Sequence, residues 1–263
     1  MKNSLISIIL PTLNEAGNIE EMISSVSDQF QGDDQFEILV VDDGSTDGTI
    51  EIVDAIQEKS PNVRLIVRTS DFGLINSIND GITQSKGGIC IWMDADLSMD
   101  PVLITSMIQE IHQGSDLVLG SRYMPGGRMK AGDPSKGKGQ LPKILYDLSK
   151  SNDSAISAMI SIFGNKILKV ILGSSIHDYS SGFYATKKEF IIDNLPHGTF
   201  VDYCISLPYH AILDGFKVTE VPMVLKARES GESKTSGSFY SILSISLRCV
   251  LLGISLRLKH GKM

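Results

Sequence analysis

The chain has 263 residues, of which 42% are hydrophobic and 21% are charged, and its formal net charge is −7. This length suits one large α/β domain or two small ones, and it allows a sizeable core. The negative charge argues against general nucleic-acid binding, because such binding needs many cations to neutralise phosphates. Three scattered cysteines in no C-x-x-C spacing provide neither a disulfide framework nor a zinc site, and they suit a reducing, cytosolic environment.

Strand patterns alternate with helical patterns through the first half of the chain. Strands are predicted over residues 5–10, 36–41, 63–67, 89–93 and 116–120. Helices are predicted over residues 18–30, 49–59, 74–85 and 101–112. Repeated βα units predict an α/β fold with a doubly wound, mostly parallel sheet that binds ligands at the carboxyl ends of its strands.

The regular pattern stops between residues 124 and 143, where glycines and basic residues dominate. This segment is interpreted either as a solvated surface loop or as a lid that meets an anionic acceptor or a membrane surface. Beyond it, helices are predicted over residues 153–172, 188–195 and 202–213, and strands over 183–186 and 217–225. The last of these strands contains Pro222, which suits the edge of a sheet.

The C-terminal segment, residues 239–258, predicts a helix that is apolar over most of its circumference. Such a helix is either buried in protein or lies in a bilayer interface. Arg248 in its middle disfavours a membrane-spanning role. We therefore predict a catalytic domain over residues 1–237, followed over residues 238–263 by an apolar, amphipathic helix that packs on the core or lies on a membrane surface.

Two carboxylates, Asp94 and Asp96, directly follow the predicted strand 89–93. In extended backbone this i, i+2 spacing points both side chains to the same side. Neighbouring carboxylates repel each other, so the pair suits a hard divalent cation such as Mg²⁺ or Mn²⁺ that also binds a phosphate-bearing ligand. The alternative is two exposed acids that cap the strand and the next helix.

Three nucleotide-binding and catalytic motifs are missing from the sequence. There is no G-x-G-x-x-G after the first strand, no G-x-x-x-x-G-K-[ST] and no G-x-S-x-G. These absences argue against a nicotinamide or flavin dehydrogenase, a P-loop ATPase and an α/β-hydrolase. Acids at the strand ends, with Arg122, Arg228 and Lys234 as phosphate partners, instead predict a nucleotide-sugar site.

Six segments together carry a resemblance to a known family. They are residues 9–15 (ILPTLNE), 40–48 (VVDDGSTDG), 93–97 (MDADL), 120–123 (GSRY), 178–183 (DYSSGF) and 228–234 (RESGESK). In this order they resemble the inverting family 2 glycosyltransferases of the A-type fold, and within them the dolichyl-phosphate mannose synthase group of polyprenyl-phosphate glycosyltransferases. The first four segments are shared by many family 2 enzymes, whereas the last two are typical of lipid-phosphate acceptors.

The resemblance implies roles for the residues that bind the nucleotide sugar. It implies a nucleoside pocket lined by Pro11, Leu13, Glu15, Val41 and Asp43. It implies that Asp94 and Asp96 hold the diphosphate through a divalent metal ion, and that Ala95 between them also contacts the nucleotide sugar. Ser98 is the third metal-ligand candidate, but relatives often have glutamine there, and a serine hydroxyl reaches a metal only through water.

The resemblance also implies cations that neutralise the leaving nucleoside diphosphate. These are Arg122, Arg228 and Lys234, which together with Asp96 are the catalytic candidates. The segment after Tyr123 is longer and richer in glycine than in the relatives, so acceptor residues do not carry over from them one by one. The acceptor candidates are Arg128, Lys130, Lys136 and Ser181.

The leading hypothesis is transfer of a hexose, with mannose from GDP-mannose as first choice, to a polyprenyl (dolichyl) phosphate with inversion at the anomeric carbon. A phosphate oxygen is already anionic at neutral pH, so this acceptor needs no general base. The basic loop and the C-terminal helix would bring the enzyme to the cytoplasmic face of a membrane as a peripheral protein. A separate membrane-anchoring subunit is an additional candidate partner.

Two alternatives stay open. The first is a family 2 glycosyltransferase with another donor, such as a UDP-sugar, and a hydroxyl acceptor on a glycan or protein; Asp178 would then be the base. The Q-x-x-R-W motif of processive polysaccharide synthases is missing. The second is a non-catalytic subunit that binds a nucleotide sugar, which Asp94 and Asp96 argue against and Ser98 keeps open.

Overall fold

A computed structural model of the chain describes residues 5–30, 35–128, 152–226 and 239–260. Its strands are β1 (Ile6–Thr12), β2 (Phe36–Asp42), β3 (Val63–Val67), β4 (Ile89–Trp92), β5 (Leu117–Ser121), β6 (Tyr184–Lys187) and β7 (Val218–Pro222). The helices are α1 (Ile19–Ser27), α2 (Thr49–Gln57), α3 (Leu74–Gln84), α4 (Leu103–His112), α6 (Asn152–Leu172), α7 (Lys188–Ile191), α8 (Phe200–Leu213) and α9 (Phe239–His260). Every strand and helix predicted from the sequence is present, with ends that differ by a few residues.

The strands form one sheet in the order β3-β2-β1-β4-β6-β5-β7. β6 is antiparallel to both of its neighbours, β4 and β5, whereas the other pairs are parallel. The predicted doubly wound, mostly parallel sheet is therefore confirmed, and the insertion of an antiparallel β6 is a feature that the βα pattern did not predict. β7 ends the sheet, as predicted from Pro222.

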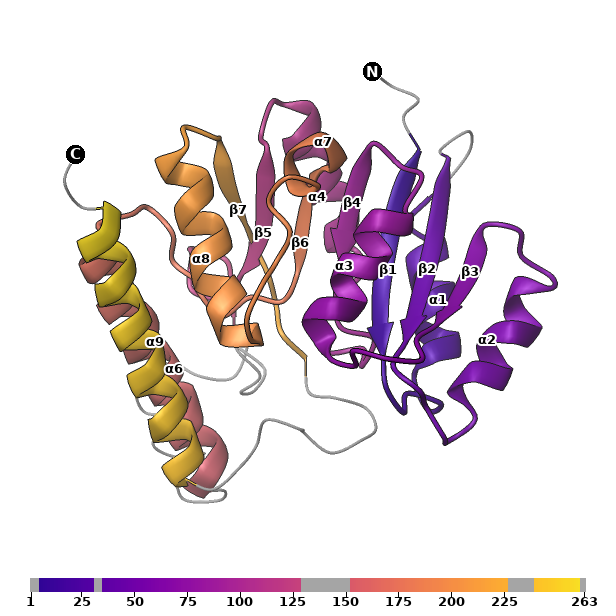
Figure 1. Ribbon diagram of the computed structural model, residues 1–263, viewed down its shortest axis with the longest axis horizontal. Coiled ribbons are helices and arrows are strands. Elements are labelled where there is room, and N and C mark those ends of the chain that lie inside the picture. Colours follow the sequence, from indigo (N-terminus) through magenta and orange to yellow (C-terminus); the bar gives the residue numbers. More distant parts are fainter. Residues whose placement is uncertain (1–4, 31–34, 129–151, 227–238, 261–263) are drawn as a thin grey trace.

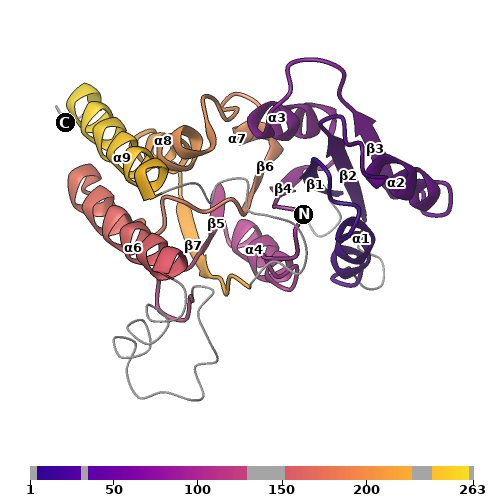
Figure 2. The same ribbon diagram turned by 90° about the horizontal axis from the view of Figure 1, so that it is seen from below.

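Helices cover both faces of the sheet (Figures 1 and 2). Successive side chains of a strand point to opposite faces, and β1 shows the consequence. Ile8 and Leu10 join one core with residues of α1, α2 and α4, whereas Ile9 joins a second core with residues of α3, α7 and α8. This central strand is thus buried on both faces at every residue except Pro11, as is typical of doubly wound sheets.

α3 lies very close to β1 at Gly81. A Cβ atom at this position would lie 2.4 Å from Cγ2 of Ile9, which is closer than real Cβ atoms come to a neighbour. Glycine therefore lets α3 pack directly on β1. The segment between β3 and α3, residues 68–73, is thereby held next to the ends of the central strands.

α6 and α9 lie side by side at the β7 end of the molecule (Figures 1 and 2). Gly253 of α9 allows this contact, because a Cβ there would lie 2.7 Å from Cδ2 of Leu168. α9 also contacts α8, where Arg248 donates to Asp202 at 2.7 Å. α9 is therefore packed on the protein along one side. Within the described ranges, no helix is both long enough and apolar enough to cross a membrane.

Candidate functional site

The carboxyl ends of β1, β2 and β4 meet at one edge of the sheet, toward which the arrowheads of β1 and β2 point in Figure 1. β1 lies between the other two strands, with Pro11 opposite Val41 and Ile9 opposite Trp92. Ligands of doubly wound sheets bind at this edge. The structure brings together here the residues predicted for the nucleoside and the diphosphate: Pro11, Leu13, Glu15, Val41, Asp43, Asp94, Ala95 and Asp96.

The loops after β1 and β2 are tied to each other. The backbone N–H of Glu15 donates to Thr49 Oγ1 at 2.9 Å, and the backbone N–H of Asn14 donates to Ser45 Oγ at 2.7 Å. The Glu15 carboxylate accepts a hydrogen bond from the side chain of Asn18 at 2.8 Å. Glu15 is therefore held at the start of α1 by both its backbone and its side chain.

The two adjacent acids after β2 have different environments. Asp42 is fully buried, and its carboxylate accepts from the backbone N–H groups of Gly44 and Ser45 at 2.9 and 2.7 Å. It also accepts from the hydroxyls of Ser45 and Thr12. Asp42 therefore shapes the turn, so Asp43 is the acid of the pair that remains a candidate for the nucleoside pocket.

Asp43 is held by Arg68, a residue that sequence reasoning missed. Arg68 Nη1 lies 2.5 Å from Asp43 Oδ1, and Ser77 and the backbone N–H of Gly73 also donate to the carboxylate. Burial disfavours the charge of Arg68, but hydrogen bonds and ion pairs with Asp80 and Asp43 outweigh burial and raise its pKa. A cation directly after a predicted strand was the available signal, but nothing near it in the sequence pointed to Asp43, 25 residues earlier, as its partner.

The chain bends shortly after β4, over residues 95–97, and Asp94 directly precedes the bend; residues 94–98 together are called the Asp94–Ser98 turn. Asp94 is half-buried, whereas Asp96 is 4% exposed and accepts from the backbone N–H of Ser98 at 3.0 Å. Leu97, which directly follows Asp96, has a positive φ of 60°, which is unusual for a leucine. Backbone strain of this kind is common where a turn must present side chains to a ligand.

A divalent cation fits the chemistry of this turn. Two carboxylates offer the hard oxygen ligands that Mg²⁺ and Mn²⁺ prefer. Gly182 lies beside them, since a Cβ on it would be 3.7 Å from Asp94 Oδ1. Among the described residues, no group of three or more His, Cys, Asp or Glu side chains is arranged to hold a metal ion. Asp94 and Asp96, with Ser98 as the third predicted ligand, are the residues that would hold such an ion.

Arg122 forms a buried ion pair with Asp178. Its Nε and Nη2 donate to the two carboxylate oxygens at 2.8 Å each, and its backbone N–H donates at 3.0 Å. Nη2 also donates to the side chain and the carbonyl of Ser180. Burial disfavours both charges, but their mutual attraction and hydrogen bonds outweigh it, raising the pKa of Arg122 and lowering that of Asp178. Arg122 therefore anchors the Asp178 turn.

The chain beyond β7 runs toward the Asp94–Ser98 turn. The backbone N–H of Lys226 donates to the carbonyl of Ser98 at 2.8 Å, and Lys226 Nζ pairs with Asp100 at 2.7 Å. Arg128 is exposed and hydrogen-bonds through its backbone to Met223 and Leu225. The structure therefore places Arg128 beside this segment.

The structure describes Ser181 but not the remaining predicted cations. Arg228, Lys234, Lys130 and Lys136 lie outside the described residues. Ser181 is 1% exposed, and its hydroxyl accepts from the backbone N–H of Phe183 at 3.2 Å. The hydroxyl of Ser181 therefore bonds within its own turn.

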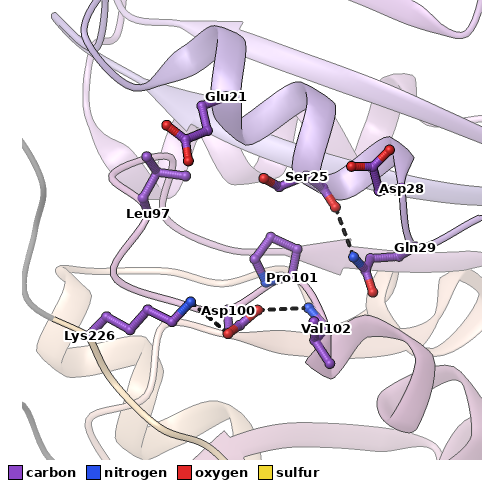
Figure 3. Close-up of a pocket in the computed structure, with 9 residues that line it drawn as sticks. All are labelled: Glu21, Ser25, Asp28, Gln29, Leu97, Asp100, Pro101, Val102 and Lys226. Carbon is purple, nitrogen blue, oxygen red and sulfur yellow. Dashed lines mark hydrogen bonds and ion pairs between the residues drawn. The ribbon is translucent and has the colours of Figure 1, made fainter.

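A second pocket lies between α1 and residues 97–102, so that Leu97 of the Asp94–Ser98 turn forms part of its wall (Figure 3). Its wall carries the carboxylates of Glu21, Asp28 and Asp100, and Lys226 is paired with the last of these. A surface with this excess of acids repels phosphate. The sheet edge is therefore a more favourable binding site for the diphosphate of a nucleotide sugar than this pocket.

The family model of Glycosyl transferase family 2 matches residues 7–194. This match contains the ends of β1, β2 and β4, the Arg122–Asp178 pair and β6. The chain is a family 2 glycosyltransferase. The family predicted from the six sequence segments is thus confirmed.

Curated relatives of this glycosyltransferase share about a third of its residues. It is 34% identical over 236 residues to a dolichol-phosphate mannosyltransferase of Pyrococcus furiosus, with 88% of this chain and 59% of that protein covered. It is 33% identical to a polyprenol monophosphomannose synthase of Mycolicibacterium smegmatis, with 88% of this chain and 81% of that protein covered. The chain thus spans less than two thirds of the Pyrococcus protein but most of the mycobacterial one.

Solved structures share the fold of this glycosyltransferase. Glucosyl-3-phosphoglycerate synthase of Mycobacterium tuberculosis, in complex with Mn²⁺, UDP and phosphoglyceric acid, superposes with a TM-score of 0.65 at 17% identity, covering 96% of this chain and 78% of the other. The predicted A-type glycosyltransferase fold is therefore confirmed. Solved neighbours of this fold bind a divalent metal ion together with a nucleotide.

Proposed function

We propose that this enzyme transfers mannose from GDP-mannose to a polyprenyl (dolichyl) phosphate with inversion at the anomeric carbon. The observation that carries the proposal is the similarity to relatives named dolichol-phosphate mannosyltransferase and polyprenol monophosphomannose synthase, which extends over 88% of the chain. The paired acids at the sheet edge support a nucleotide-sugar donor for the same site.

Different residues at the sheet edge would bind different parts of the donor nucleotide sugar. Asp43 would accept hydrogen bonds from the base, while Pro11 and Val41 provide apolar contact. Asp94 and Asp96 would hold Mg²⁺ or Mn²⁺, which when bound neutralises charge on the diphosphate. Arg228 and Lys234 are proposed to stabilise the leaving nucleoside diphosphate, together with Arg122. Since Lys226 contacts Ser98, the chain reaches the acidic turn two residues before Arg228.

The state of Asp178 favours a phosphate acceptor over a hydroxyl acceptor. A sugar or protein hydroxyl needs a general base within hydrogen-bond reach, with a pKa near the working pH. Asp178 is fully buried, is paired with Arg122 and has a lowered pKa. It is therefore a poor base. An acceptor phosphate is already an anion, so positioning and charge neutralisation suffice.

The exposed faces of α6 and α9 support attachment to a membrane surface. Each helix presents an apolar stripe at helical spacing: Phe163, Ile167 and Val170 on α6, and Leu247, Leu251, Ile254 and Leu258 on α9. Val170 is 82% exposed and Leu258 is 76% exposed. Lys166 and Lys259 lie exposed next to these stripes. Exposed apolar stripes flanked by lysines are typical of helices in a lipid interface.

The proposed lipid acceptor indicates where in the cell the reaction takes place. A polyprenyl phosphate resides in a membrane, so we propose a peripheral protein on the cytoplasmic face. A membrane-anchoring subunit that covers the α6 and α9 stripes is the alternative means of attachment. Binding to protein-free vesicles distinguishes the two.

The decisive experiment offers labelled GDP-mannose, GDP-glucose, UDP-glucose and UDP-N-acetylglucosamine to the enzyme with a short polyprenyl phosphate, detergent and Mg²⁺ or Mn²⁺. We expect organic-extractable label from GDP-mannose alone. We expect Asp96→Asn to abolish the transfer, whereas the matched control Asp100→Asn retains it, because Asp100 pairs with Lys226 outside the proposed donor site. Label in lipid from a UDP-sugar instead would contradict the donor, and label only on an added glycan would contradict the acceptor.

A further inference from the structure

Phe72 is an exposed aromatic residue at the edge of the site. It lies between β3 and α3, and the residue is 58% exposed. Its ring lies against Gly44, since a Cβ on Gly44 would be 3.5 Å from Cε1 and 3.8 Å from Cζ of the ring. Gly44 directly follows Asp43. The phenyl ring is thus next to the acid of the proposed nucleoside pocket.

The backbone on both sides of Phe72 is linked to Asp43 by hydrogen bonds, directly or through Arg68. Gly73, the next residue, donates its backbone N–H to Asp43 Oδ2 at 2.5 Å. The carbonyl of Asp71, the preceding residue, accepts from Arg68 Nη2 at 2.6 Å, and Arg68 is itself paired with Asp43. Both neighbours of Phe72 are therefore connected to Asp43.

The conformation of this segment is also constrained. Asp71 has a positive φ of 51°, which few non-glycine residues adopt. Its carbonyl accepts a second hydrogen bond, from Asn76 at 2.8 Å. The two hydrogen bonds to the Asp71 carbonyl fix the backbone directly before Phe72.

A single exposed phenylalanine needs no function, since apolar side chains are common on protein surfaces. Three features together point to a ligand at this one: the ring lies against Gly44, next to Asp43, its loop is fixed by hydrogen bonds, and more than half of this aromatic residue is exposed. Nucleobases have flat π faces that stack on aromatic rings, and a neighbouring carboxylate accepts from their N–H groups. An aromatic ring beside a carboxylate therefore matches a base.

We propose that Phe72 forms the outer wall of the nucleoside pocket and stacks on the base of the donor nucleotide. This inference rests on the proposed function, because it assumes a nucleoside diphosphate at the sheet edge. A purine offers a larger face than a pyrimidine, so stacking on Phe72 favours a guanine nucleotide over a uracil nucleotide. Phe72 would thereby contribute to the choice of donor.

The test measures GDP, UDP and pyrophosphate affinities by calorimetry in the presence of Mn²⁺. We expect Phe72→Ala to weaken GDP binding by about 5- to 150-fold. The loss for UDP is expected to be smaller, and that for pyrophosphate, which has no base, negligible. Phe72→Trp should retain GDP binding. The control is Phe216→Ala, which removes a partly exposed ring before β7, at the opposite edge of the sheet.

Each outcome separates this inference from the function on which it rests. If wild-type protein binds GDP and Phe72→Ala binds it within twofold, the stacking role is refuted while the donor site stands. Equal losses for GDP and pyrophosphate would show that the substitution only disturbs the acidic turn, which also refutes stacking. Failure of the wild type to bind any nucleoside diphosphate would overturn the donor site and this inference together.

Discussion

Replacing Arg122 with methionine is expected to destabilise the fold strongly. The substitution keeps an unbranched side chain but removes two charge-assisted hydrogen bonds of 2.8 Å to Asp178, which is fully buried. Each such bond contributes about 1.5–3 kcal/mol, and leaving a buried charge unpaired costs about 3–5 kcal/mol. We therefore expect the free energy of unfolding to fall by about 3–5 kcal/mol. For a domain of this size the melting temperature should fall by roughly 6–20 °C.

Urea denaturation of a double-mutant cycle measures this effect. The cycle compares wild type, Arg122→Met, Asp178→Asn and the double variant. Removing both charges leaves no unpaired ion, so the double variant should be more stable than the sum of the single losses implies. A loss below about 1 kcal/mol for Arg122→Met, or additive single losses, would refute the view that this pair stabilises the turn.

The same variants are expected to differ in their pH dependence. The folded pKa of Asp178 is lowered from its ordinary value near 3.8. The ion pair therefore stabilises the fold fully above that value, and the contribution is lost as the pH falls through the folded pKa. The stability difference between wild type and Arg122→Met should shrink as the pH falls below about 4. A difference that is constant from pH 7 to pH 3 would contradict this assignment.

Three further predictions follow from the packing and the site. Leu251→Gln combined with Leu258→Gln should reduce sedimentation with vesicles at least about tenfold, because two apolar side chains no longer enter the lipid. Gly81→Ala should lower the free energy of unfolding by about 1–3 kcal/mol in urea denaturation, because the added methyl group overlaps a β1 side chain. Arg68→Lys cannot reproduce the guanidinium contacts that hold Asp43, so we expect the Kd for GDP to rise by about tenfold in calorimetry.

Controls decide how these results are interpreted. For the vesicle assay the matched change is Ile192→Gln, which removes an exposed apolar side chain just beyond α7, and it should leave sedimentation unchanged. Retained vesicle binding by the Leu251 and Leu258 variant would refute the membrane-facing role of α9. For Arg68→Lys, unaltered GDP affinity would show that Asp43 does not depend on its ion pair for binding.

Local sequence patterns were sufficient for the secondary structure and the class of fold. Strands and helices place apolar residues at different regular spacings, and these spacings can be read from consecutive residues of the sequence. Asp94 and Asp96 were predicted from a local signal of the same kind, a pair of acids directly after a buried strand, although the chain bends at this point and is not extended as the i, i+2 argument assumed. Pro222 likewise marked an edge strand, since it has no N–H to donate to a neighbour.

Contacts between residues distant in sequence were decided only by the tertiary structure. The chain order of strands did not reveal that β6 enters antiparallel between β4 and β5, and this insertion brings the Asp178 turn to Arg122. Nor did the pattern near Arg68 identify Asp43, 25 residues earlier, as its partner.

The sequence by itself therefore determined the elements, the family resemblance and the acids at the strand ends, because each is a short-range property of the chain. The tertiary structure decided which charges neutralise one another and which apolar faces stay exposed. It paired Arg122, a predicted phosphate partner, with a buried carboxylate that the sequence did not identify, and it left stripes of α6 and α9 uncovered. The physical reason is that burial and pairing are set by the packing of distant segments.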